Sequence, residues 1–139
     1  ETIIKRYEIF TTTLEYKFIL DAKLEVIVNA DRKKIEQVIY NLINNAINYT
    51  GDDKIVYIRI YEKNGTMVEI TDTGKGIDDK EKDLIWDKYY RSKKNHKRNT
   101  VGTGLGLAIV KQILELHQFE YGVSSTKNKG TTFYFKINH

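Results

Sequence analysis

The sequence predicts an α+β fold, a two-layer sandwich in which a mixed, mostly antiparallel sheet carries helices on one face. Two segments, residues 31–50 and 104–117, have apolar residues at helical spacing. Short apolar segments elsewhere are paired around turns rich in Asn, Gly and Lys, which is typical of β-hairpins. A chain of 139 residues without an internal repeat holds one such core.

The first half of the chain is predicted to contain one terminal helix, two short strands and one long helix. Apolar residues recur at helical spacing in residues 1–16, which we interpret as the end of a helix. Residues 18–21 and 26–28 are expected to be short strands joined by a polar turn. Asp31 is then expected to cap a long helix that ends at residues 50–53.

The second half is predicted to contain two β-hairpins and a second long helix. That helix, residues 104–117, has apolar residues on most faces and is therefore expected to be largely buried. Residues 80–86 can form a short helix, and residues 87–101, polar and without periodicity, are interpreted as a long mobile loop. The four hairpin strands are residues 55–62, 67–71, 119–125 and 131–137.

The composition excludes several classes of protein. The chain has no cysteine, which rules out disulfides and thiolate metal sites. Its longest apolar runs, such as residues 55–58, are far shorter than the roughly 20 residues that a membrane-spanning helix needs. No signal-peptide pattern opens the sequence. We therefore expect the chain to be soluble and cytoplasmic, with the anchoring of any parent protein left open.

Positive charge is concentrated in one segment. The net charge is +4, and six basic residues but no acidic ones lie between residues 88 and 98. Such a run is compatible with nucleic acid, an anionic membrane, a phosphate ligand or simply a solvated loop. Charge alone does not separate these possibilities, so the neighbouring motifs have to decide.

The first long helix carries four asparagines within two turns, at positions 41, 44, 45 and 48. Asparagine is a poor helix former, which makes the cluster informative. On a helical wheel, Asn41, Asn45 and Asn48 share one edge of the apolar stripe, while Asn44 is expected to point towards solvent. The cluster is interpreted as a row of amides for a metal and a polar ligand, or else as surface asparagines without function.

A second motif, Asp72-Thr73-Gly74-Lys75-Gly76-Ile77, directly follows a predicted strand. Its two glycines allow the backbone to pass close to a flat ligand, and Gly can adopt positive φ without penalty. A carboxylate at the strand end is an acceptor suited to an exocyclic amine. Taken alone the motif is weak, because many tight turns look like it.

A third motif, Gly102-Thr103-Gly104-Leu105-Gly106-Leu107-Ala108, runs into the start of the second helix. Free N–H groups and the positive end of the helix dipole make such a start a phosphate site. The motif has neither the Gly-Lys-Ser/Thr of a Walker A loop nor the spacing of a dinucleotide fold or protein-kinase loop. The alternative is a plain glycine hinge.

In this order, the three motifs resemble the N, G1 and G2 boxes of the histidine kinase family, within the superfamily of gyrase, Hsp90, histidine kinase and MutL ATPases. Residues 85–91, Ile-Trp-Asp-Lys-Tyr-Tyr-Arg, resemble its F box. The resemblance extends from Phe18 to Ile137 and includes Gly130-Thr131-Thr132-Phe133. It implies a Bergerat-type ATP-binding fold with a mobile lid, ATP and Mg²⁺ as cofactors, and phosphoryl transfer to histidine.

The resemblance also implies roles for individual residues. Asn45 would ligate Mg²⁺, and Asn41 stands where the related ATPases have a general-base glutamate, which favours transfer to a protein acceptor over hydrolysis. Asp72 would accept a hydrogen bond from the adenine amino group. Arg91, counted with Asn41 and Asn45 as catalytic, and Lys88 would approach the phosphates. The other implied nucleotide contacts are Asn48, Tyr49, Gly74, Gly76, Ile77, Tyr90, Gly102, Thr103, Gly104, Leu105, Gly106, Leu107 and Thr132.

The resemblance leaves the roles of two residues open. The family often has lysine where this chain has Asn48, so phosphate affinity is expected to depend more on the lid. Tyr49 is expected to stack on or wall the adenine, or else to close the helix end as a core aromatic.

The acceptor histidine that the family phosphorylates is not in this sequence. His96, His117 and His139 all lack its context; His96 is assigned to the lid and His117 to a structural role at a helix end. Residues 1–16 would be the end of the dimerisation hairpin or a linker, and residues 17–139 the catalytic domain. The implied partners are that hairpin domain and a response regulator receiver domain, with a monomeric domain in a homodimeric parent.

Three other functions are alternatives to this one. A serine kinase of the anti-sigma type or an ATPase belongs to the same superfamily, but Asn41 and the F-box segment argue against the ATPase. A nucleotide sensor without transfer is opposed by the intact motifs and is decided only by a transfer assay. A nucleic-acid module is not expected, because the basic residues are confined to the lid between nucleotide motifs.

Overall fold

The computed structural model describes residues 16–22, 30–87, 106–126 and 128–138. Strand β1 (Lys17–Ala22) comes first and helix α3 (Arg32–Tyr49) second. Strands β2 (Ile55–Glu62) and β3 (Thr66–Asp72) form a hairpin. A single 3₁₀ turn, η1 (Leu84–Trp86), and helix α4 (Gly106–Leu116) follow. Strands β4 (Glu120–Thr126) and β5 (Gly130–Ile137) form the last hairpin.

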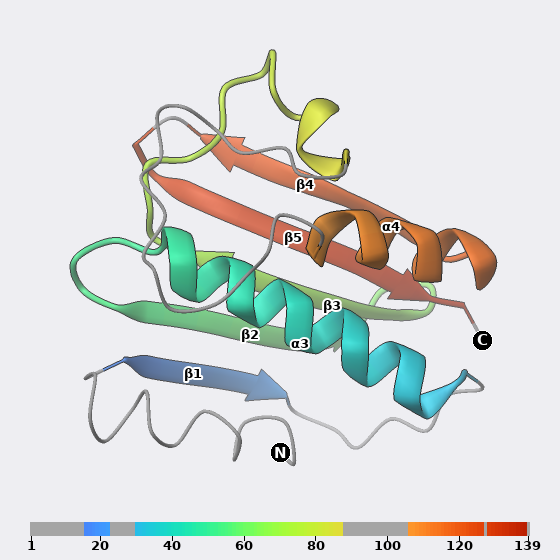
Figure 1. Ribbon diagram of the computed structural model, residues 1–139. Coiled ribbons are helices and arrows are strands. Elements are labelled where there is room, and N and C mark those ends of the chain that lie inside the picture. Colours follow the sequence, from blue (N-terminus) through green and yellow to red (C-terminus); the bar gives the residue numbers. More distant parts are fainter. Residues whose placement is uncertain (1–15, 23–29, 88–105, 127, 139) are drawn as a thin grey trace.

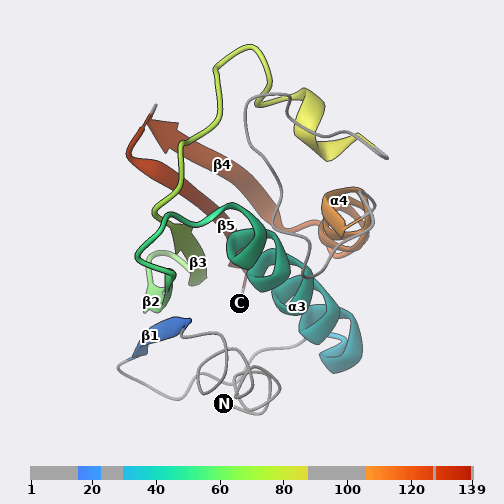
Figure 2. The same cartoon turned by 60° about the vertical axis from the view of Figure 1, so that its left-hand side comes forward.

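The five strands form one open sheet in the order β1-β2-β3-β5-β4. Strand β1 pairs with β2 in parallel, and the other three pairings are antiparallel. Helices α3 and α4 lie side by side over one face of this sheet (Figures 1 and 2). The predicted two-layer α+β sandwich with a mixed sheet is therefore confirmed.

Alternating side chains build the core between the two layers. In β3 and β5 every second residue is buried, and these residues face α3 and α4. The aliphatic stripe of α3 packs on them from the other side. The largest fully buried side chains of the described core are Phe135, Leu42, Ile43, Ile47, Ile70, Leu114, Val38, Val56 and Val110.

Helix α3 begins and ends as the sequence predicts. The Asp31 carboxylate accepts a hydrogen bond from the Lys34 N–H at 3.2 Å, which satisfies one of the free N–H groups of the first turn. At the other end, the Thr50 N–H donates to the Ala46 carbonyl at 2.8 Å and the backbone then becomes extended. The helix therefore has a fixed length, and its last turn presents Tyr49 to the loop after β3.

Two predicted elements differ from the structure, and a third is described only in part. The first of the two short strands is β1, which pairs in parallel with β2, while the second, residues 26–28, lies outside the described residues. Of residues 80–86 only the last three are helical. Helix α4 is buried on one side only, at Val110, Ile113 and Leu114, and Leu116 is 77% exposed. One layer of sheet covers one face of a helix, so its remaining apolar residues stay at the surface.

No described helix combines the length and the apolar character that crossing a bilayer requires.

Candidate active site

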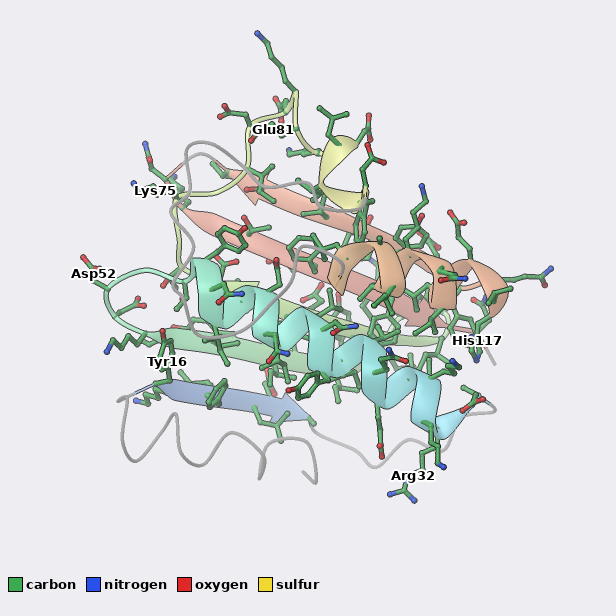
Figure 3. The ribbon with its side chains drawn as sticks, in the orientation of Figure 1. Tyr16, Arg32, Asp52, Lys75, Glu81 and His117 are labelled. Carbon is green, nitrogen blue, oxygen red and sulfur yellow. The ribbon has the colours of Figure 1, made fainter. Side chains whose placement is uncertain are left out.

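The end of helix α3, the end of strand β3 and the start of strand β5 meet at one end of the sheet. Figure 3 shows Asp52 and Lys75, which follow α3 and β3, at this end, and Arg32 and His117 at the opposite end. The start of α4 lies against the middle of α3 instead, because a Cβ on Gly106 would lie 3.8 Å from the Cβ of Asn41. Helix α3 thus contacts described parts of the other two sequence motifs.

A network of three side chains fixes the end of α3 against the end of β3. The hydroxyls of Thr50 and Thr73 lie 3.2 Å apart, and the Thr50 hydroxyl donates to the Ile55 carbonyl at 2.6 Å. The Thr73 hydroxyl donates to the Asp53 carboxylate at 2.6 Å and accepts from the Gly51 N–H at 3.3 Å. Each hydroxyl is thus used as both donor and acceptor, which sets the spacing between the asparagines of α3 and Asp72.

The two glycines of the loop after β3 are required by close approaches. A Cβ on Gly74 would overlap the carbonyl oxygen of Tyr49, so the loop can touch the last turn of α3 only with glycine here. Gly76 has φ +81°, and a Cβ there would lie 2.6 Å from the carbonyl oxygen of Thr126. The loop is therefore held between α3 and the β4–β5 hairpin.

Asp72 is the most perturbed acid of the described site. It is 3% exposed, and its Oδ1 accepts a hydrogen bond from the Gly74 N–H at 2.8 Å. Burial raises the pKa of Asp72 to about 6, although hydrogen bonds from the backbone of Gly74 and Thr131 act in the opposite direction. A buried carboxylate whose charge is not balanced by a cation is suited to accept hydrogen bonds from a ligand amine.

The four asparagines of α3 are distributed differently from the prediction. Asn41 and Asn45 are half-buried, whereas Asn44 and Asn48 are buried, at 9% and 4% exposure. The prediction that Asn44 points to solvent is wrong. A helical wheel projects the whole helix onto one circle, so it merges the exposed N-terminal half around Gln37 with the enclosed C-terminal half.

Asn41 contains a polar atom that needs a partner. Its Nδ2 is buried and has no hydrogen-bond partner in the described part of the chain. A buried amide N–H without a partner costs about 1–3 kcal/mol, and proteins retain such groups chiefly where a ligand or a water completes them. Asn41 is also the residue that faces Gly106 at the start of α4. A polar, anionic ligand between α3 and α4 would satisfy this group.

The segment that resembles the F box is anchored by its aromatic and aliphatic residues. Ile85 and Trp86 are buried. The Trp86 ring packs edge-on against the rings of Tyr121 and Phe133, with ring centroids 5.1 Å and 5.6 Å apart. Of the predicted site residues in this segment and the lid, Lys88, Tyr90, Arg91, Gly102, Thr103, Gly104 and Leu105 lie outside the described residues, as does His96.

Thr132 does not face the site. Its hydroxyl lies 2.8 Å from that of Thr71, and both residues are on the sheet face away from the helices. The neighbour Thr131 is buried and stands opposite Asp72 in the β3–β5 register. Of these two residues, Thr131 is therefore the one on the helix-facing side beside Asp72, since side chains alternate between the faces of a strand.

Sequence reasoning also missed Ser125. Its hydroxyl oxygen accepts from the Ile77 N–H at 2.7 Å and so fixes the loop after Gly76 to β4. The only available signal was the hairpin register, which places Ser125 opposite Thr131. Ile77 itself is half-buried against the core, as a wall residue should be.

His117 has the structural role that the sequence suggested. Its Nδ1 donates to the Ile113 carbonyl at 2.9 Å, and its Nε2 accepts from the Asp31 N–H at 3.4 Å. The ring thus joins the end of α4 to the start of α3. Beside it lies a groove of about 420 Å³, lined by Asp31, Lys34, Gln37, Ile109, Gln112, Ile113, Leu116 and His117.

Comparison with known proteins identifies the family. Residues 30–139 match the model of the histidine kinase-, DNA gyrase B- and HSP90-like ATPases. The chain belongs to this family. The sensor protein kinase WalK of Staphylococcus aureus is 35% identical over 139 residues, and the circadian input-output histidine kinase CikA of Synechococcus elongatus is 34% identical over 123 residues.

Solved structures agree with these relatives. The catalytic domain of the histidine kinase ThkA superposes with a TM-score of 0.82 at 28% identity, over 99% of this chain and 88% of that one. The mycobacterial sensor histidine kinase MprB gives 0.80 at 26% identity, over 98% and 93%. The matches cover 97% of this chain but 22% of WalK, and 86% of this chain but 16% of CikA. The chain is the ATP-binding catalytic domain of a sensor histidine kinase.

Proposed function

We propose that this domain binds Mg²⁺-ATP and transfers the γ-phosphoryl group to a histidine on a helical hairpin domain elsewhere in its parent protein. The observation that supports this most is that α3 contacts both other motifs: Asn41 lies against Gly106 at the start of α4, and Tyr49 lies against Gly74, next to Asp72. The Nδ2 of Asn41, which has no partner among the described residues, and the buried carboxylate of Asp72 are then the two ends of one nucleotide site.

At the adenine end, Asp72 accepts from the exocyclic amine while Gly74, Gly76 and Ile77 let the base approach the loop. The close contact between Gly74 and the Tyr49 carbonyl supports a position for Tyr49 beside the base. A charge-assisted hydrogen bond to a desolvated carboxylate contributes roughly 1.5–3 kcal/mol to binding.

At the phosphate end, Asn41, Asn45 and Asn48 would present amides, and the positive end of the α4 dipole lies at Gly106 and Leu107. Lys88, Tyr90, Arg91 and residues 102–105 would add the cations and N–H groups of the lid.

The side-chain oxygens of these asparagines also fit a magnesium ion. Asn45 would hold it through its side-chain oxygen, and the ion would neutralise phosphate charge when bound. Within the described residues no cluster of three His, Cys, Asp or Glu side chains offers a metal site. Magnesium that takes most ligands from phosphates and water requires no such cluster. Asn41, an amide, is not a base, which favours a protein acceptor over water.

The partners of the parent protein belong to the same proposal. ThkA has been solved in complex with the response regulator protein TrrA, at 25% identity to this chain and a TM-score of 0.78. By analogy, a receiver domain would take the phosphoryl group from the histidine here. We place the domain on the cytoplasmic side, as a monomer within a homodimeric parent.

The proposal is tested by phosphoryl transfer. The chain, incubated with γ-labelled ATP, is expected to label nothing by itself, to label a separately supplied hairpin domain slowly, and to label a covalently joined one fast. Holding the acceptor in line lowers the barrier by roughly 7–11 kcal/mol. The label should be acid-labile and base-stable. No transfer with the joined hairpin, or label on the isolated chain, would contradict the proposal.

Nucleotide affinity is expected to fall as the pH drops through 6. Asp72 offers the amine a charged acceptor only when ionised, and its pKa in the free domain is raised to about 6. The ionised fraction is then about 0.9 at pH 7 and about 0.1 at pH 5, so the ADP affinity should decrease roughly tenfold between them. Calorimetric titrations at both values check this, with Asp72→Asn as the control that should lose the dependence.

A further inference from the structure

Ser125 lies beside the adenine end of the site without being part of the loop that forms it. It stands in β4 opposite Thr131 in β5, and Tyr121 and Val123, four and two residues before it, pack towards the helix layer. Its hydroxyl oxygen has three neighbours. They are the Ile77 N–H at 2.7 Å, the Gly130 carbonyl oxygen at 3.0 Å and the Thr131 hydroxyl at 3.0 Å.

The direction of each of these hydrogen bonds follows from the chemistry of the partners. A backbone N–H only donates and a carbonyl only accepts, so the Ser125 hydroxyl accepts from Ile77 and donates its proton to Gly130. Its remaining lone pair faces the Thr131 hydroxyl, which must then donate. The proton of Thr131 is therefore directed into the β4–β5 hairpin, and its oxygen offers only lone pairs to any further partner.

Thr131 is also the neighbour of Asp72. The two residues are paired in register on the helix-facing side of β3 and β5, where directly opposed side chains lie about 4.5–5.5 Å apart. Both are buried, at 4% and 3% exposure. The Thr131 backbone donates a hydrogen bond to the Asp72 carboxylate. We call Asp72 and Thr131 the floor of the site. This floor consequently presents two adjacent hydrogen-bond acceptors and no hydroxyl donor.

We propose that Ser125 is a positioning residue for base selection. It accepts the hydrogen bond of the Thr131 hydroxyl, so that Asp72 and Thr131 can both only accept hydrogen bonds from a base. This inference rests on the proposed nucleotide function. An exocyclic amine has two N–H donors and matches such a floor. The 6-oxo group of guanine or hypoxanthine is an acceptor and meets lone pairs there, so a purine with an amine at this position is selected.

The test compares the affinities of ADP and IDP, which differ at the 6-position of the purine. In Ser125→Ala the Thr131 hydroxyl is free to rotate and donate to the 6-oxo group. The preference for ADP over IDP should therefore fall about tenfold, close to the value of one hydrogen bond, and most of the change should be a gain in IDP affinity. General damage to the site would lower both affinities together.

Matched variants separate this role from a packing role. Ser125→Thr keeps the hydroxyl and should keep the wild-type preference. Thr131→Val removes the acceptor and should reduce the preference by itself. Adding Ser125→Ala to Thr131→Val should then change nothing further, because Ser125 acts through Thr131. If Ser125→Ala does not fold, Thr131→Val alone should still lower the preference.

The outcomes are distinguishable. Wild-type protein that binds neither nucleotide overturns the proposed function and this inference together. Protein that binds ADP but shows an unchanged ADP-to-IDP ratio in Ser125→Ala overturns the inference alone, as does a further loss of preference when Ser125→Ala is added to Thr131→Val.

Discussion

Replacing Asp72 with asparagine is expected to weaken ADP binding at least tenfold and, at the same time, to raise the stability of the free domain at pH 8. The first effect follows from losing a charge-assisted hydrogen bond to the adenine amine. The second follows from burial. The pKa of Asp72 is about 6 in the folded chain and 3.8 as its ordinary value, so the ionised carboxylate opposes folding at high pH.

The sign of the pH dependence separates the effect of the buried charge on stability from a general destabilisation by the substitution. A carboxyl whose pKa is raised on folding costs stability above pH 6, and that cost disappears as the pH falls towards 4. Asp72→Asn should thus be more stable than the wild type at pH 8, by about 1–3 kcal/mol, with a much smaller difference at pH 4. Urea unfolding at both pH values measures it.

A matched control is Asp79→Asn, since the Asp79 side chain is 93% exposed and forms a surface ion pair with Lys82. It should alter stability by no more than about 0.5 kcal/mol at either pH. An Asp72→Asn variant that is less stable than the wild type at pH 8 would show that the buried carboxylate does not carry this cost.

The second large effect is expected from Asn45→Ala, which should reduce phosphoryl transfer to a joined hairpin domain at least hundredfold. Asn45 would be the protein's ligand to the metal, and its loss leaves phosphate charge without a fixed counter-charge. Adenine binding at Asp72 is separate, so ADP without Mg²⁺ should bind almost as in the wild type. Transfer rates and ADP calorimetry over a Mg²⁺ series measure both quantities.

Gln37→Ala provides the control on the same helix, because Gln37 is exposed and belongs to the opposite end of α3. It should transfer at the wild-type rate. Transfer that survives in Asn45→Ala, or that is lost equally in Gln37→Ala, would contradict the assignment of the metal ligand to Asn45.

Local signals in the sequence predicted the architecture well. Asp31 could be identified as a helix cap because its side chain bonds within one turn, and the hairpin turns are marked by their own residues. The sequence motifs also pointed to Asn41, Asp72 and Gly106, and the fold connects their motifs through α3, which contacts Gly106 at Asn41 and Gly74 at Tyr49.

The errors arose where the answer depends on packing between elements. Asn44 is buried because the second half of α3 is enclosed on sides that the wheel treats as solvent. The sequence did not show that Thr131, and not Thr132, faces the helix layer, because the face of a strand residue depends on register and one position reverses it. Ser125 could not be found from the motifs, since its role exists only once β4, β5 and the loop at Ile77 are adjacent.

The most direct test of the nucleotide site is an amide NMR titration of this chain with Mg²⁺-ADP. The largest shifts are expected at Asn41 and Asn45, at residues 74–77 and at Thr131, with small shifts around His117. Shifts confined to the groove beside Lys34 and His117, or none at saturating ADP, would contradict the site described here.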